Sequence, residues 1–147
     1  MEELKIAEIK VSYSTGGNLK ASITGSESAY RLLLSCWDKS IIEFQEEFKV
    51  LLLNRANKVL GIYPLSKGGV SGTFVDPKVV FSVALKCNAS GLILSHNHPS
   101  GNLSPSESDK SLTKKLIAAG KFLDIKILDH IIITSGSYYS FADEGIM

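Results

Sequence analysis

Two histidines separated by one residue, His96 and His98, are the side chains in this sequence best suited to metal chemistry. They follow the apolar run 91–94, which has turn residues around it and predicts a short buried strand. Because side chains alternate along a strand, residues i and i+2 point to the same side, so both imidazoles can face one point in space. Pro99 and Gly101 are expected to end this strand and turn the chain.

A helix is expected directly after the turn. Its start has the pattern of a capping box, with Ser104 as the cap, Pro105 at the first helical position and Glu107 reaching back to the cap. Ser106 and Asp109 are three residues apart and share one face of this helix. If the loop folds that face toward the histidines, two imidazoles and one carboxylate surround an open fourth position, which is the ligand set of a catalytic zinc site.

A His-x-His pair alone is weak evidence for a metal, because paired histidines on a strand often satisfy hydrogen bonds in a core. The whole pattern is more specific: His-x-His-Pro-x-Gly is followed by Ser-x-x-Asp at 106–109. It resembles the JAMM metal motif of the JAB/MPN metallopeptidase family, and most closely its RadC-like branch. The resemblance covers roughly residues 45–141 and implies that His96, His98 and Asp109 bind zinc (Zn2+).

The resemblance also implies a general base. In JAMM proteins a glutamate at the beginning of an early strand holds the water at the metal and takes its proton, and the RadC-like form of this motif is Gln-Glu-x-Phe. The run Gln45-Glu46-Glu47-Phe48 matches it at Glu46. Composition alone favours two solvated charges at a strand end, and strand alternation prevents both glutamates from facing the site. We therefore expect Glu46 to be the base, and Ser106 to donate a hydrogen bond to the developing oxyanion.

The implied activity is zinc-dependent hydrolysis of peptide or isopeptide (amide) bonds in a peptide or protein substrate. The alternatives are a RadC-type protein associated with DNA repair, which acts on or near DNA, and a non-catalytic MPN scaffold. The formal net charge is +1 and no block of five or more basic residues occurs, so the sequence lacks a general signature of nucleic-acid binding. A scaffold would be expected to have lost metal ligands, whereas all are present here.

The fold implied by the resemblance is α/β, with a mixed β-sheet flanked by helices in the JAB/MPN (cytidine-deaminase-like) architecture. Residue patterns predict strands over 48–53 and 58–63, a glycine-rich loop over 66–73, a helix from Asp76 to near Asn88, and strand-like runs over 125–128 and 131–134. Residues 1–44 are expected to form a strand and a helix that pack on the RadC-like JAB/MPN domain at 45–147, as one globular unit.

Within the first part, alternation over residues 5–13 predicts an edge strand that pairs with the main sheet or with a partner chain, which leaves a homodimer open. Ser26 is expected to cap a helix over 27–37, in which Trp37 fills the core. We interpret His130 as a core or supporting histidine, since three protein ligands already complete a catalytic zinc site.

The bulk properties are those of a globular chain in a reducing compartment. The sequence of 147 residues is 44% hydrophobic, and no apolar run approaches the roughly 18 residues that span a bilayer. Its start lacks the pattern of a signal peptide, so we expect a cytoplasmic location and no membrane association. Cys36 and Cys87 are too few for a disulfide framework and are expected to be buried thiols.

Overall fold

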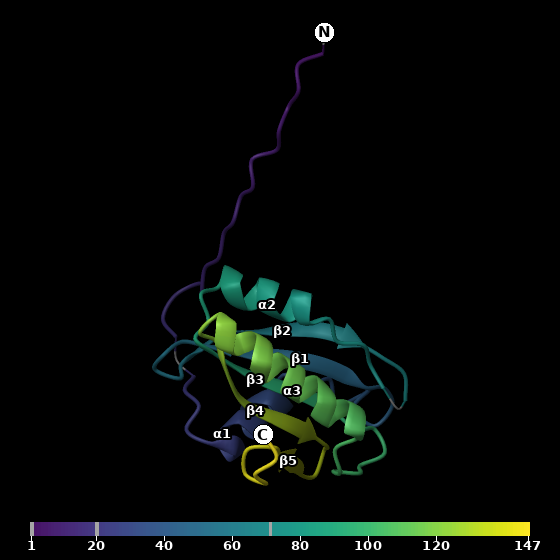
Figure 1. Ribbon diagram of the computed structural model, residues 1–147. Coiled ribbons are helices and arrows are strands. Elements are labelled where there is room, and N and C mark those ends of the chain that lie inside the picture. Colours follow the sequence, from purple (N-terminus) through teal and green to yellow (C-terminus); the bar gives the residue numbers. More distant parts are fainter. Residues whose placement is uncertain (1, 20, 71) are drawn as a thin grey trace.

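The computed structural model describes residues 2–19, 21–70 and 72–147 (Figure 1). Met1 and Lys20, in the N-terminal part, and Ser71, in the glycine-rich loop, lie outside the described residues. The described residues form one five-stranded sheet in the order β2-β1-β3-β4-β5. The strands are β1 (Glu47–Leu53), β2 (Val59–Lys67), β3 (Gly91–Asn97), β4 (Lys126–Ile133) and β5 (Tyr138–Ser140). Only β3 and β4 are parallel among neighbouring strands, so the sheet is mixed, as predicted.

Helices cover both faces of the sheet. In Figure 1, α2 (Pro77–Lys86) and α3 (Glu107–Phe122) lie on one face, and α1 (Ser26–Ser35) lies on the other. Along β1, Phe48, Val50 and Leu52 pack with α2 and α3, whereas Leu51 and Leu53 pack with α1. Every residue of β1 and β3 is buried, because helices cover both faces of the sheet and alternate side chains pack into the two cores on either side of it.

The connection after β3 determines where the predicted metal ligands lie. The chain leaves β3, turns, forms α3 and returns as the parallel strand β4, so α3 is the crossover helix of a βαβ unit. Gly101 has φ of 81° in the turn, a backbone conformation that favours glycine, and its N–H donates to the carbonyl of His98. The N-terminus of α3 therefore begins close to the end of β3.

The cap of α3 differs from the prediction. Ser106, and not Ser104, is the N-cap: its hydroxyl oxygen accepts from the N–H of Asp109 at 3.0 Å, and the Asp109 carboxylate accepts from the N–H of Ser106 at 2.8 Å. The N–H of Ser104 instead donates to the side chain of Asn102. These reciprocal hydrogen bonds satisfy the backbone N–H groups of Ser106 and Asp109, which explains why the helix begins two residues later than expected.

The prediction for the cap of α1 was also wrong by one residue. Gly25 is the N-cap, Ser26 is the first helical residue, and the Ser28 hydroxyl oxygen accepts from the N–H of Gly25. The helix ends at Ser35, so Trp37 lies beyond it, although its side chain is buried in the core as predicted. Cys87 is buried as expected, whereas Cys36 is exposed.

The predicted strand over residues 5–13 is not present among the described residues 2–19, which extend away from the sheet in Figure 1. Alternation would place Ala7, Ile9, Val11 and Tyr13 on one side of such a strand, but the described part of the sheet does not cover that side, and Leu4, Ile6, Ile9 and Val11 stay exposed to solvent. These four side chains are between 68% and 94% exposed. A hydrogen bond from the Tyr13 hydroxyl to the carbonyl of Leu60 links the segment to β2.

The two strand-like runs predicted near the C-terminus are one strand, β4, and the predicted boundary between them lies inside it. The division of the chain at residue 44 stays a prediction. Among the described helices, none combines the length and the apolar character that crossing a bilayer requires. The cytoplasmic location also stays a prediction.

Candidate metal centre

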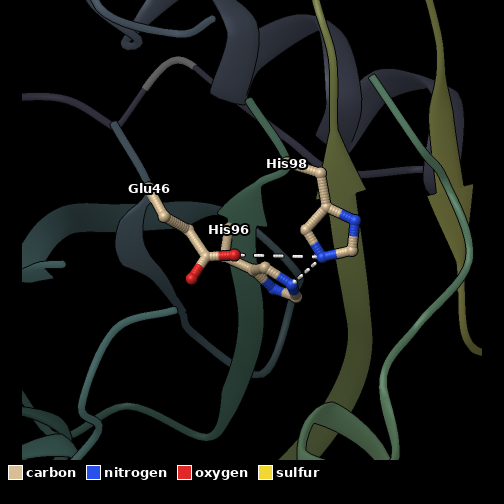
Figure 2. A group of neighbouring side chains, drawn as sticks. All are labelled: Glu46, His96 and His98. Atoms are coloured by element: carbon tan, nitrogen blue, oxygen red, sulfur yellow. Dashed lines mark hydrogen bonds and ion pairs between the residues drawn. The ribbon is translucent and has the colours of Figure 1, made fainter. Parts of the chain in front are cut away.

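Four side chains predicted to do chemistry meet at one end of the sheet. His96 lies near the end of β3, His98 directly follows this strand, and Asp109 lies in the first turn of α3. Glu46 immediately precedes β1, and the antiparallel register pairs Phe48 with His96, which places Glu46 across from His98. Figure 2 shows Glu46, His96 and His98 pointing toward one another.

The ligand atoms of His96, His98 and Asp109 form a compact triangle. The two histidine Nε2 atoms are 3.0 Å apart, and Asp109 Oδ2 lies 3.4 Å from His96 Nε2 and 3.5 Å from His98 Nε2. A tetrahedral ion with ligands about 2.0–2.1 Å away has ligand atoms about 3.3–3.4 Å apart. The triangle therefore has the size of one face of a zinc coordination tetrahedron.

Glu46 offers a second carboxylate to the same centre, and Glu46, His96 and His98 form a group that could hold a metal ion. Its Oε1 lies 3.9 Å from His98 Nε2, which is farther than the Asp109 oxygen. The Asp109 distance is therefore closer to the edge length of a zinc tetrahedron than the Glu46 distance is. Burial raises the pKa of Glu46, and the neighbouring histidines only partly offset this effect.

The second nitrogen of each histidine is already hydrogen-bonded. His98 Nδ1 lies 2.6 Å from the carbonyl oxygen of Asn102, which can only accept, so this nitrogen carries the proton and Nε2 presents its lone pair. His96 Nδ1 lies 2.8 Å from Nε2 of His130. Hydrogen bonds of this kind to the second nitrogen orient the histidines of metal sites.

The charged groups at the centre shift one another's pKa values. Burial alone would raise the pKa of Asp109, but the nearby side chains of His96 and His98 and the hydrogen bond from the N–H of Ser106 outweigh burial and hold this pKa well below its usual range. Burial likewise lowers the pKa of His98, but the carboxylate of Asp109 and the carbonyl of Asn102 raise it by more. The site therefore favours an anionic aspartate, which is the form that binds a metal.

Glu47 does not join this site. Its side chain is buried and lies 3.5 Å from the ammonium group of Lys49, which also stacks over the ring of Trp37. The structure thus separates the two glutamates, as strand alternation requires.

Asn97 is a residue that the sequence analysis missed. Its Oδ1 accepts from the N–H of Glu47 at 2.7 Å, and its Nδ2 donates to the carbonyls of Ile42 and Gln45 at 2.8 and 2.9 Å. It therefore holds both sides of Glu46 in place from the face of β3 opposite to the histidines. The available signal was its polarity, because an amide on a buried strand must find hydrogen-bond partners.

The backbone of Glu46 is held from the other side by the glycine-rich loop. Its N–H donates to the carbonyl of Gly69, and its carbonyl accepts from the N–H of Gly68. A Cβ atom on Gly68 would overlap the carbonyl of Gly72, so the loop can close on Glu46 only with glycine at this position. The glycine-rich loop predicted over 66–73 thus contributes to positioning Glu46.

A cleft of about 430 Å³ opens onto the four side chains. Apolar side chains, among them Phe48, Val75 and Leu112, form one part of its wall. Ser106 contributes its hydroxyl group beside Asp109, and because this hydroxyl accepts from a backbone N–H, its own proton is free to be donated into the cleft.

A family profile described as RadC-like JAB domain matches residues 23–146. The chain belongs to the RadC-like JAB domain family. This confirms the predicted family and its α/β architecture, and the matched region of the RadC-like JAB domain includes α1 as well as the sheet.

Three relatives of this RadC-like JAB domain, each called a UPF0758 protein, illustrate how broadly it is shared. The chain is 60% identical over 101 residues to the protein of Flavobacterium johnsoniae, with 69% of this chain and 44% of the relative covered. It is 42% identical over 130 residues to that of Porphyromonas gingivalis, with 87% and 56% covered. It is 33% identical over 138 residues to that of Symbiobacterium thermophilum, with 88% and 59% covered. The chain therefore spans about half the length of these relatives.

Proposed function

We propose that this chain is a zinc-dependent hydrolase of peptide or isopeptide bonds. The observation that carries the proposal is the triangle of His96 Nε2, His98 Nε2 and Asp109 Oδ2, with edges of 3.0, 3.4 and 3.5 Å and the Glu46 carboxylate beside it. Two imidazoles and a carboxylate form a catalytic rather than a structural set, because they leave one position for water or substrate.

His96, His98 and Asp109 would hold the ion, which when bound supplies a Lewis acid and lowers the pKa of water toward about 7. Glu46 would take the proton of the attacking water and deliver it to the leaving amine. Its raised pKa suits a group that must both accept and return a proton near neutral pH. Ser106 would donate its hydroxyl proton to the carbonyl oxygen as negative charge develops there, with support from the N-terminus of α3.

The charge of the cleft supports an amide substrate over DNA. Its wall holds the carboxylates of Glu46 and Asp109 and, among the described residues, no lysine or arginine. Proteins that bind a nucleic-acid backbone place cationic side chains against the phosphates. A peptide or protein substrate therefore fits the cleft better than a phosphodiester does, while a DNA-associated role and a homodimer stay predictions.

The metal is tested by analysing protein purified without added metal. We expect near-stoichiometric zinc in the wild type and its loss in His96→Ala and in Asp109→Ala. Glu107→Ala is the matched control, because this carboxylate lies in the same turn of α3 but is 92% exposed and paired with Lys110. Equal trace metal in all four proteins would end the hydrolase proposal.

The base is tested with a defined peptide mixture, in which new amino termini are detected by mass spectrometry. Glu46→Gln should keep its zinc and lose about 10²- to 10⁴-fold in turnover, the usual contribution of a general base. Glu47→Gln, which alters the neighbouring carboxylate on the opposite face, should leave turnover close to that of the wild type. If only Glu47→Gln loses turnover, the base has been assigned to the wrong glutamate.

A further inference from the structure

A line of buried hydrogen bonds runs from one proposed metal ligand to the backbone of another. His96 Nδ1 lies 2.8 Å from His130 Nε2, and His130 Nδ1 lies 2.7 Å from the Thr113 hydroxyl oxygen. The Thr113 hydroxyl donates to the carbonyl oxygen of Asp109 at 2.7 Å. The side chains of His96, His130 and Thr113 are at most 2% exposed, so water does not compete for these bonds.

The direction of the protons along this line follows from its last member. A threonine hydroxyl has one proton, and a carbonyl oxygen can only accept, so the Thr113 proton points to Asp109. Thr113 must then accept from His130, which places the single proton of a neutral His130 ring on Nδ1. His130 Nε2 is left to accept from His96, so the His96 proton lies on Nδ1.

This direction leaves the lone pair of His96 on Nε2, the atom that faces His98 and Asp109. The opposite direction would leave the oxygens of Thr113 and the Asp109 carbonyl 2.7 Å apart with no proton between them. The orientation of the His130 ring is fixed by the stacked Phe141 ring, with ring centroids 4.5 Å apart, and by an edge contact with Phe48.

We propose that Thr113 and His130 are positioning residues that set the tautomer of His96 so that its Nε2 lone pair is available to the metal. The proposal rests on the proposed metal site. It gives Thr113, seventeen residues before His130 and on α3, a role in metal binding although it does not face the ion. It also links His96 to Asp109, because both ends of the line belong to proposed ligands.

The test replaces Thr113 by valine, which has the same shape without the hydroxyl. We expect Thr113→Val to bind zinc about 10- to 100-fold more weakly than the wild type in competition with a chromophoric chelator, the usual effect of losing a supporting hydrogen bond. Thr113→Ser keeps a hydroxyl at this position and should bind within threefold of the wild type. Thermal unfolding of the metal-free proteins separates this effect from a loss of folding.

A second measurement reads the tautomer directly. In metal-free wild-type protein at pH 8, the ¹⁵N chemical shifts of His96 should show the proton on Nδ1 and a bare Nε2. A proton on Nε2 of His96 would overturn the proposal even if Thr113→Val does not fold, and so would zinc affinity in Thr113→Val equal to that of the wild type. If the wild type shows the expected tautomer and binds no zinc, the proposed function fails while the assignment of the hydrogen bonds stands.

Discussion

Replacing Asn97 by alanine should destabilise the protein far more than the replacement of a single polar residue usually does. The side chain is fully buried and makes three hydrogen bonds, to the N–H of Glu47 and to the carbonyls of Ile42 and Gln45. A buried group left without its partner costs about 1–3 kcal/mol, so the buried N–H of Glu47 and carbonyl of Ile42 together cost at least about 2 kcal/mol, and the part-buried carbonyl of Gln45 adds a smaller cost. That is a large part of the roughly 5–15 kcal/mol by which a domain is usually stable.

Urea unfolding of metal-free protein measures this cost. Asn54→Ala is the matched control, because Asn54 accepts from the N–H groups of Ala56 and Lys58 but lies in an exposed turn, where water can replace it. We expect the control to lose about 1 kcal/mol or less. If Asn97→Ala is no more destabilised than Asn54→Ala, burial is not what makes these bonds important. Any Asn97→Ala protein that folds should keep zinc and lose turnover, since the substitution displaces the segment with Glu46 and not the histidines.

Two further predictions concern pH and packing. Burial lowers the pKa of His98, but the neighbouring carboxylates raise this pKa by more, so that it lies above its ordinary value of about 6.5. Zinc must displace the proton of His98 when it binds. Zinc affinity should therefore fall by about tenfold per pH unit once the pH drops below this raised pKa. Chelator competition from pH 5.5 to 8.5 checks this, and a constant affinity down to pH 6 would contradict it. Gly120→Ala should cost about 1–3 kcal/mol in urea unfolding, because a Cβ there would overlap the carbonyl of Ile125 and push α3 from β4. Gly61→Ala, where a Cβ meets nothing, should be close to neutral, and equal effects in both variants would refute the packing argument.

Local patterns were sufficient to predict most of the sheet. The apolar runs that became β1 and β3 are short and bounded by turn residues, and the pair Asp76-Pro77 marks the start of α2 because the aspartate accepts from the N–H of Lys78. Alternation along β3 also predicted that His96 and His98 would face one point, and their Nε2 atoms lie 3.0 Å apart. These features depend on neighbours within a few residues, so the sequence carries them directly.

The features that the sequence did not reveal depend on partners far away in the chain. Asn97 meets residues about 50 positions earlier, and Thr113 meets His130 across the crossover. The cap of α3 was misplaced for a related reason, because Ser104 and Ser106 both satisfy the local rule. What distinguishes them is the Asp109 carboxylate, which the histidines and the N–H of Ser106 hold in one orientation.

Adjacent side chains of β3 point to opposite faces of the sheet and have different roles, so the geometry of the site depends on the register of the sheet. His96 faces the cleft, whereas Asn97 faces the α1 side and holds the chain on either side of Glu46. A slip of one residue between β1 and β3 would reverse both, since it turns every side chain to the other face. The bond from the N–H of Glu47 to Asn97 fixes that register at the end of the sheet where the proposed ligands lie. The central residue of the His-x-His pattern, Asn97, therefore holds the site in register, although its side chain does not face the proposed metal position.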